Sequence, residues 1–401
     1  MSAPGRSERD AWLALASVEG VGDVTLARCI RRFGSAEATL RVIAGSRPDR
    51  ASRLLRETLP GIRGGVVERI VAAAADPDAI HRALAAHGAW AVTPLDPAYP
   101  AQLRELDPPP LVLHGVGDAA LVGVRHAVAV VGTRHPTPAG RAMAARIARR
   151  LVEADVAVIS GLAIGIDGAA HAATVEAGGR TVAVIGGGFD HPGPRAHDRL
   201  RAAILAGGGA VVSEHAPSIA PSRGTFPRRN RIISVLAAAT IVVEAPVRSG
   251  ALITARHALE QGRRLLVVPG RPGDPSTEGC LGLLRETPAR PLVGLDEMLA
   301  DLGLDSETRD DDGAEVPALG RDAALALLGP VERSVARTLA AGPVTTDRIM
   351  EATGLSAAVV SGALTLLQLR GWAQPMGPLQ LAAGPLLAEP RRRVRRTGGV
   401  R

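Results

Sequence analysis

Three arginines and one asparagine gather in a short stretch of the sequence that has the chemistry to bind phosphate groups. The stretch reads Phe226-Pro227-Arg228-Arg229-Asn230-Arg231, and Phe226 is one of only three phenylalanines among the 401 residues. A guanidinium group binds a phosphate through paired hydrogen bonds, and a nearby ring can stack on a base. We therefore interpret the stretch as a phosphate-binding loop. The alternative is a solvated helix start in which Arg231 pairs with an acid.

Glycine follows most of the apolar segments that we expect to form strands. In an open parallel sheet, ligands bind outside the carboxyl ends of the strands. Glycine there lets a phosphate approach the backbone and accept hydrogen bonds from N–H groups at a helix start. The repeat along one edge predicts a phosphate-bearing ligand, with ordinary turns as the alternative. These ends contain Gly132, Thr133 and Arg134; Ser160 and Gly161; Gly186, Gly187 and Gly188; Ser213 and Glu214; Glu244, Ser249 and Gly250; Pro269 and Gly270.

The elements that must position these residues alternate between short apolar runs and helical patterns. The runs are rich in Val and Ile, and alternation at this spacing predicts a doubly wound, mostly parallel α/β sheet. Strands are expected at 127–131, 156–160, 181–185, 210–213, 240–244 and 265–268, and helices include 138–153, 166–177 and 254–261.

The N-terminal part is predicted to be a small helical domain over residues 1–90. Its turn Val18-Glu19-Gly20-Val21-Gly22-Asp23 lies between helical patterns at 12–17 and 24–33. This is typical of a helix-hairpin-helix, whose backbone N–H groups can hold a phosphate, although a plain helical turn is the alternative. The sheet domain is expected over 91–300. It begins with a proline-rich connector in which 111–114 forms an edge strand.

The C-terminal part is predicted to contain a linker, a small domain and a tail. Residues 301–320 are acidic and poor in apolar side chains, as in a disordered linker. Helical patterns at 346–353 and 356–369 have helix–turn–helix spacing, and 371–381 is expected to be a two-stranded wing. We therefore predict a winged-helix-like domain over 321–385, followed by a basic disordered tail over 386–401.

Composition excludes several classes of protein. The net charge is +7, but six arginines after Glu389 supply six of those charges, so DNA binding must rest on local clusters. All 47 basic residues are arginine, which excludes a P-loop ATPase because its phosphate loop needs a lysine. The turn after the first expected strand, Gly132-Thr133-Arg134-His135-Pro136, lacks the dinucleotide fingerprint, so we expect no NAD or FAD and no other cofactor.

The cysteines and the N-terminal residues indicate a cellular compartment. Cys29 and Cys280 are too few for a disulfide framework or a structural zinc site. The first residues are polar, without the apolar segment of a signal peptide, and no apolar span approaches about 20 residues. We expect a soluble, cytoplasmic protein that needs no metal.

Four further side chains bear on whether the chain is an enzyme. We interpret Asp167 as an N-terminal helix cap rather than a catalytic base. His171 follows one turn later, and we expect a packed, hydrogen-bonded histidine rather than a metal ligand, because no other ligand lies at suitable spacing. Glu214 and Glu244 are expected to pair with the arginines of Arg228–Arg231. We therefore expect no catalytic residue.

Many separate motifs resemble one known family. The segments VVGTR, SGLAIGIDGAAH, GGRTVAVIGGGFD, VVSEH, FPRRNRIIS, VVEAPVRSGALITARHALEQGR and VVPG follow one another from residue 130 on, after YPAQL and DPPPLVLHG. They resemble the extended Rossmann-like core of the DNA-processing protein A (DprA/Smf) family over roughly residues 90–290. The two flanking regions are similar to the variable flanking domains of that family.

The resemblance implies a function in DNA recombination rather than catalysis. It implies a homodimer that holds single-stranded DNA in a basic pocket and hands it to the RecA recombinase during transformation. Carried over by motif, Arg134, Ser160, Gly161 and the arginines of Arg228–Arg231 would bind phosphates. Stacking of Phe226 on a base is expected from the chemistry of its ring alone.

The chain departs from the family pattern in two places. After Asp190 the family has Tyr-Pro and then Asn, whereas this chain reads His191-Pro192-Gly193-Pro194-Arg195. Arg195 is expected to supply positive charge there. A later family Asn is replaced by Leu281, so we expect altered affinity for DNA.

Two other functions remain open from the sequence. One is a nucleotide-processing N-glycoside hydrolase of the lysine-decarboxylase-like type, in which Ser249–Thr254 and Glu260 would take the place of a catalytic loop and carboxylate, although the Pro-Gly-Gly of that loop is missing. The other is a sequence-specific transcription factor, which rests only on the C-terminal helix–turn–helix pattern.

Overall fold

The computed structural model describes residues 7–62, 64–222, 224–304, 328–340, 344–369, 373–375 and 381–383. The chain divides into two compact units, Met1–Thr308 and Arg309–Arg401, which are described separately. The predicted tail and the predicted linker beyond residue 304 lie outside the described residues. Among the helices that the structure describes, none is long and apolar enough to cross a membrane.

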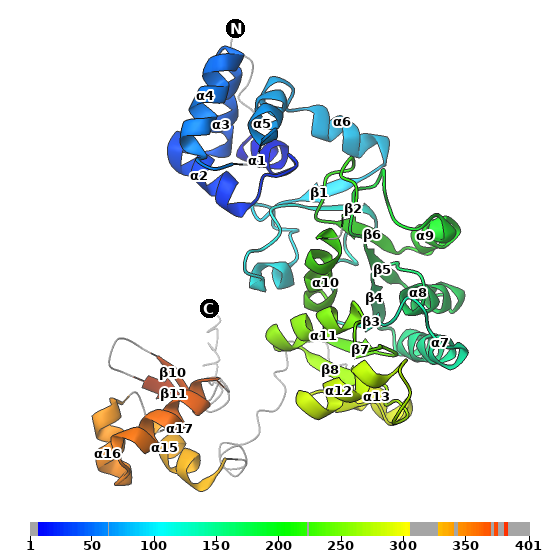
Figure 1. Cartoon of the computed structure of the whole chain (residues 1–401), viewed down its shortest axis with the longest axis vertical. Coiled ribbons are helices and arrows are strands. Elements are labelled where there is room, and N and C mark those ends of the chain that lie inside the picture. Colours follow the sequence, from blue (N-terminus) through cyan, green and yellow to red (C-terminus); the bar gives the residue numbers. More distant parts are fainter. Residues whose placement is uncertain are drawn as a thin grey trace, which may run out of the picture. The chain divides into compact units, whose positions relative to one another are not determined.

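The N-terminal part of the first unit is helical, as the sequence predicts, and its described residues form six helices (Figure 1). Their apolar faces meet in a common core that includes Leu15, Leu26, Ile43 and Leu55. The carboxylate of Glu8 accepts hydrogen bonds from two backbone N–H groups at the start of the third helix, which satisfies donors that the helix itself leaves free. The helices are α1 (Glu8–Ala16), α2 (Asp23–Phe33), α3 (Ala36–Ala44), α4 (Pro48–Thr58), α5 (Val66–Ala75) and α6 (Ala79–Ala86).

A nine-stranded, mostly parallel sheet forms the rest of the first unit. The strand order is β1-β2-β6-β5-β4-β3-β7-β8-β9; β1–β2 and β2–β6 are antiparallel, and the other pairs are parallel. All six predicted strands are present, with ends shifted by at most two residues. The strands are β1 (Trp90–Val92), β2 (Leu113–Gly117), β3 (Ala127–Val131), β4 (Ala157–Ser160), β5 (Thr181–Val184), β6 (Ala210–Ser213), β7 (Ala239–Val242), β8 (Arg264–Val267) and β9 (Arg290–Pro291).

Helices cover both faces of the sheet, as a doubly wound fold requires (Figure 1). One buried core joins the sheet to α7, α8 and α13, and another joins it to α10, α11 and α12. The direction of strand addition reverses at β3, since β4 lies on one side of it and β7 on the other. The helices are α7 (Pro138–Glu153), α8 (Ile166–Glu176), α9 (Asp198–Ala206), α10 (Thr225–Val235), α11 (Ala251–Glu260), α12 (Glu278–Glu286) and α13 (Asp296–Leu302), with short 3-10 turns η1 (Ala101–Glu105) and η2 (Arg195–His197).

The predicted edge strand at 111–114 is wrong in its bounds and its place. The observed strand, β2, begins at Leu113 and is not at the edge, because β1 pairs with its outer side. Gly115 makes this pairing possible: a Cβ atom there would lie 2.1 Å from the ring of Trp90. The indole N–H of Trp90 also donates a hydrogen bond to the carbonyl of Gly117 at 2.9 Å.

The second unit contains three described helices and a small antiparallel ribbon. Both predicted helices of the helix–turn–helix are present, and the ribbon corresponds to the predicted wing. Leu339, Ile349, Val360 and Leu367 are buried together in its core. The elements are α15 (Pro330–Ala340), α16 (Thr346–Thr353), α17 (Ala357–Leu369), β10 (Ala373–Pro375) and β11 (Leu381–Ala383).

Candidate nucleic-acid interface at the sheet edge

Two adjoining cavities open at the carboxyl ends of the parallel strands, where the sequence predicts a ligand. The larger has a volume of about 800 Å³ and lies over the ends of β4 and β5, where Gly161, Gly186 and Gly187 line it. The other, of about 550 Å³, lies at the reversal point between β3 and β7, and Gly132, Thr133, Ser249 and Gly250 line it. Arg134, Phe226 and Arg229 line both cavities.

Arg134 and Phe226 form a stacked pair where the two cavities meet. The guanidinium carbon of Arg134 lies 5.2 Å from the centre of the Phe226 ring, within the range of a cation–π contact. Arg134 is exposed and has no ion-pair partner among the described residues. Gly186 leaves room for the ring, since a Cβ atom there would lie 3.0 Å from it. This pair therefore presents a free positive charge on an aromatic support.

The expected phosphate-binding loop at 226–231 is wrong as secondary structure, because these residues belong to α10. Pro227 does not prevent the helix, since it lies in the first turn, where a backbone N–H has no helical partner. Ile232, Ile233 and Val235 then anchor the helix in the core. The arginines of this stretch consequently point in different directions.

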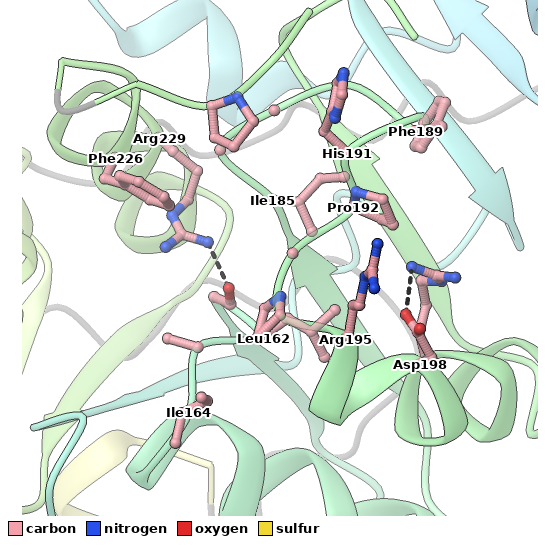
Figure 2. Close-up of a pocket in the computed structure, with 18 of the residues that line it drawn as sticks. Leu162, Ile164, Ile185, Phe189, His191, Pro192, Arg195, Asp198, Phe226 and Arg229 are labelled. Carbon is pink, nitrogen blue, oxygen red and sulfur yellow. Dashed lines mark hydrogen bonds and ion pairs between the residues drawn. The ribbon is translucent and has the colours of Figure 1, made fainter. Parts of the chain in front are cut away.

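Arg229 points inward and holds two strand ends together. Its guanidinium donates a hydrogen bond to the carbonyl of Gly161 at 2.6 Å (Figure 2). It donates a second hydrogen bond to the carbonyl of Val184. Burial lowers the pKa of Arg229 to about 10, with the nearby charge of Asp167 opposing this and that of Arg134 adding to it. A Cβ atom at Gly161 would lie 2.6 Å from the guanidinium, so glycine is needed at this position.

Arg231 and Arg228 lie beside Glu214 rather than in the described lining of either cavity. Arg231 donates to Oε2 of Glu214 at 2.6 Å and to the carbonyl of Pro108 at 3.1 Å. Arg228 is 4.0 Å from Oε1 of the same carboxylate, and 62% of its side chain is exposed. The expected pairing of Glu214 with the cluster is present, and Arg228 remains available to solvent.

The expected pairing of Glu244 with the arginine cluster is wrong. Its carboxylate accepts hydrogen bonds from the backbone N–H and the hydroxyl of Thr137, at 2.9 and 2.6 Å. Thr137 caps the N-terminus of α7, where partial positive charge stabilises a carboxylate. A Cβ atom at Gly140 would lie 2.0 Å from this carboxylate, so the helix start and Glu244 fit closely.

Asp167 is not the N-cap of α8, because Gly165 takes that position. Asp167 instead lies inside the first turn and accepts a hydrogen bond from the N–H of Gly161 at 3.1 Å. Burial raises its pKa, while the charge of Arg229 and hydrogen bonds from nearby groups oppose that rise. Its carboxylate orders the turn after β4 and lines the smaller cavity.

His171 is a packed, hydrogen-bonded residue, as expected. It is completely buried, and its Nδ1 lies 2.7 Å from the hydroxyl of Thr181. Burial lowers its pKa to about 3, with the charges of His197 and Arg229 adding to the effect. No group of three or more potential metal ligands occurs among the residues that the structure describes.

The backbone and hydroxyl groups that were expected to meet phosphate are partly engaged within the protein. The buried hydroxyl of Ser160 donates to the carbonyl of Val130 at 2.7 Å, and the N–H of Thr133 donates to that of Glu244. Gly188 packs beneath the edge, where a Cβ atom would lie 2.0 Å from the carbonyl of Ala216. These residues shape the cavities, as Arg229 does, whereas the exposed guanidinium of Arg134 presents donors to a ligand.

The loop that departs from the family pattern lines the larger cavity. Arg195 is exposed there with no ion pair among the described residues, and Figure 2 places it across the cavity from Phe226. Arg201 also lines the cavity and pairs with Asp198 at 3.3 Å. His87 contributes from the end of α6 and lies 2.7 Å from Asp190. Sequence reasoning missed His87, because nothing in its local pattern shows which distant loop it contacts.

The fold and the cavities define the class of protein. Its open sheet carries two glycine-lined, arginine-bearing cavities at the carboxyl ends of its strands, and one of them lies at the reversal point, where Rossmann-type sheets bind their ligands. A family model of the DNA recombination-mediator protein A matches residues 90–303, and one of the DprA winged helix domain matches residues 320–377. The chain belongs to the DprA/Smf family of DNA recombination mediators.

Similar proteins come from several bacteria. The putative DNA processing protein DprA of Mycobacterium tuberculosis is 37% identical over 377 residues, which cover 91% of this chain and 92% of that protein. The X-ray structure of DprA from Streptococcus pneumoniae has a TM-score of 0.57 and 29% identity, and covers 73% of this chain and 97% of its own. A structure on the single-stranded DNA binding mode of DNA processing protein A from Helicobacter pylori has a TM-score of 0.48 and 27% identity. The match covers 53% of this chain and 95% of that one.

Proposed function

We propose that this chain binds single-stranded DNA along the carboxyl edge of its sheet, with little regard to base sequence, and loads RecA recombinase onto it. The observation that carries the proposal is the guanidinium of Arg134, which is stacked on Phe226 between two cavities and has no ion pair in the described part of the chain. A backbone phosphate at this guanidinium would leave its neighbouring nucleotides over the two cavities. Membership of a recombination-mediator family supports DNA as the ligand and RecA as the partner.

The charges around the cavities support a single strand as the ligand. Arg195 and Arg248 are exposed at opposite ends of the site and have no ion pair among the described residues. Arginines spaced along an edge can follow a phosphate backbone, while aromatic and apolar surfaces contact bases of any sequence. Phe189, Ile164 and Phe226 provide such surfaces within the larger cavity. We propose Arg134, Arg195 and Arg248 as phosphate contacts, with Arg228 as an outer one.

A glycoside hydrolase is less well supported. Glu260 is at the C-terminal end of α11, 59% exposed and 3.2 Å from His257, and it is not among the residues found to line either cavity. A carboxylate must reach the scissile bond to act in such an enzyme. Asp167 lines the smaller cavity, but its carboxylate is bound by the turn after β4. We therefore propose that the chain is not an enzyme.

A sequence-specific transcription factor is also less well supported. In a winged-helix domain of a transcription factor, the second helix of the helix–turn–helix reads base edges through Arg, Lys, Asn or Gln side chains. The corresponding helix, α17, has the sequence AAVVSGALTLLQL, with no charged residue and one glutamine.

We further propose a homodimer in the cytoplasm, on the basis of the family alone.

The test compares DNA binding by wild type, Arg134→Glu and, as a control of equal charge change, Arg146→Glu on the exposed side of α7. Replacing a donor by a repelling charge should weaken single-stranded DNA binding by about 2 kcal/mol or more. Arg146→Glu should bind nearly as wild type. The rate at which RecA assembles on the bound strand should fall together with DNA binding. Normal binding by Arg134→Glu, or tighter binding to one duplex sequence, would refute the proposal.

The same samples distinguish a binding protein from an enzyme. Release of free base from nucleoside monophosphates is measured for wild type, Glu260→Gln and Asp167→Asn. We expect no release from any of them. Release by the wild type that is lost in either variant would establish a hydrolase instead.

A further inference from the structure

We propose that the helical domain carries a second nucleic-acid site, a surface on α2 and α4 that binds the phosphate backbone of duplex DNA. This surface is separate from the cavities at the sheet edge and does not depend on the function proposed above. We call it the α2–α4 face, and define it by six exposed arginines: Arg28, Arg31 and Arg32 on α2, Arg50 and Arg53 on α4, and Arg47 just before α4.

The packing of the two helices turns all six arginines outward. Leu26 and Cys29 fix the inner side of α2, and Ala51 and Leu55 fix that of α4, all within the core of the helical domain. The two helices contact each other, and both pack on α3. Residues on a helix follow one another at 3.6 per turn, so the arginines fall on the sides away from these buried residues. The two arginine-bearing sides therefore belong to helices that lie against each other.

In the described part of the chain, no acid neutralises the arginines of this face. None of the six arginines has an ion pair among the described residues, whereas neighbouring arginines do: Arg56 lies 2.6 Å from Glu68, and Arg41 lies 2.6 Å from Glu37. The two helices contribute only three acids, Asp23, Asp49 and Glu57. Repulsion among unpaired like charges is relieved when a polyanion binds.

The form of the α2–α4 face favours a duplex over a single strand. Proteins that hold single strands combine a groove with rings on which bases stack. Phe33 is the aromatic residue of these two helices, and it is half-buried with Arg32 5.9 Å from its centre. Only phosphate contacts remain. Arginines three or four residues apart on one helix have Cβ atoms about 5–6 Å apart, so α2 and α4 each present a row of closely spaced cations. A duplex backbone, with one charge per about 1.7 Å of axis, is the dense, rigid polyanion that suits such rows.

The test uses the full-length chain and two triple variants of equal charge. R28A/R31A/R53A removes three charges from the α2–α4 face. R141A/R146A/R199A removes three exposed arginines from α7 and α9 that have no ion pair with any described residue. Binding is measured to a duplex, to a single strand of the same length and to vesicles containing phosphatidylserine, at several salt concentrations. Thermal unfolding of each variant checks that the fold is kept.

The two triple variants should differ in duplex binding alone. For R28A/R31A/R53A we expect duplex Kd to rise about tenfold or more, and the log–log salt slope to become shallower by about 2 to 3, near 0.9 per lost phosphate contact. Single-strand binding should stay close to that of wild type. An unchanged duplex Kd would overturn the proposal, as would an equal loss in R141A/R146A/R199A. A loss confined to vesicle binding would assign the surface to anionic lipid instead.

Arg134→Glu separates this inference from the function proposed above. It should lose single-strand binding and keep duplex binding, the reverse of R28A/R31A/R53A. If Arg134→Glu binds single strands normally, the proposal for the sheet edge fails, and the α2–α4 face is still judged by its own variant. If Arg134→Glu loses both ligands while R28A/R31A/R53A loses neither, the duplex site lies at the sheet edge and the α2–α4 face is not a site.

Discussion

Replacing Arg229 by methionine should lower the free energy of unfolding of the protein, while the exposed charge of Arg134 at the opening of the cavities stays in place. The side chain is 5% exposed, and its guanidinium is bonded to the carbonyls at the ends of β4 and β5. Methionine fills a similar volume but donates no hydrogen bond, so both carbonyls lose a charged donor. We therefore regard Arg229 as a residue that positions the cavity rather than one that grips DNA.

The magnitude follows from these contacts. Each hydrogen bond to a charged group contributes about 1.5–3 kcal/mol, so two contribute about 3–6 kcal/mol. Removing the buried charge returns part of this, because burial of the guanidinium is itself unfavourable, as the lowered pKa of about 10 indicates. We expect Arg229→Met to lower the free energy of unfolding by about 3 kcal/mol.

The assay is urea unfolding of Arg229→Met and Arg134→Met, beside single-stranded DNA binding under conditions where both variants are folded. Arg134→Met should stay within about 1 kcal/mol of the stability of wild type, because Arg134 is exposed, has no ion pair among the described residues and loses only its cation–π contact with Phe226. It should bind DNA more weakly. Arg229→Met should instead lose stability in urea and keep most of its affinity for single-stranded DNA. Wild-type stability for Arg229→Met, combined with a loss of DNA affinity as large as that of Arg134→Met, would refute the positioning role.

Three further predictions follow from buried groups and from the division of the chain. Gly140→Ala should lower the free energy of unfolding by about 1–3 kcal/mol in urea unfolding, because its Cβ must displace the carboxylate of Glu244 from Thr137. Below pH 6.5 His171 is protonated in the unfolded chain, whereas in the folded chain it is protonated only below about pH 3. The free energy of unfolding should therefore decrease by up to about 1.4 kcal/mol for each unit by which the pH falls between these values, and His171→Gln should lose this pH dependence. Truncation after Leu304 should keep single-stranded DNA binding in a gel shift, because both cavities lie in the first unit, and complete loss would place the site elsewhere.

The central strands could be predicted from the sequence because they are buried on both faces. Such strands appear as uninterrupted apolar runs, so β3 and β6 have the predicted bounds. The outer strands carry no such pattern. β1 has three residues and β9 has two, and both depend on pairing with a neighbour rather than on their own composition. Only the tertiary structure could show that β1 covers the outer side of β2.

The position of the cavities at the carboxyl edge could be predicted from the fold class, but the partners of the polar groups there could not. Glu214 and Glu244 each lie just after the end of a short apolar strand. The carboxylate of Glu244 nevertheless accepts a hydrogen bond from Thr137, whereas that of Glu214 accepts one from Arg231. Their difference arises from the helix that each strand end faces, which depends on the topology. The contribution of His87 from α6 is likewise a long-range contact.

The arginine cluster shows why adjacency in sequence does not mean convergence on one ligand. On a loop, Arg228, Arg229 and Arg231 could turn toward the same phosphate. On a helix, successive side chains point about 100° apart, so at most one or two of them share a side. Here Ile232 and Ile233 fix the inner face of α10, and this directs Arg229 into the core and Arg231 to Glu214. The positive charge at the site must then come from other segments, and Arg134, Arg195 and Arg248 provide it from three separate strand ends. A backbone that lies across all three would be held at several points along the edge, which a single cluster could not achieve.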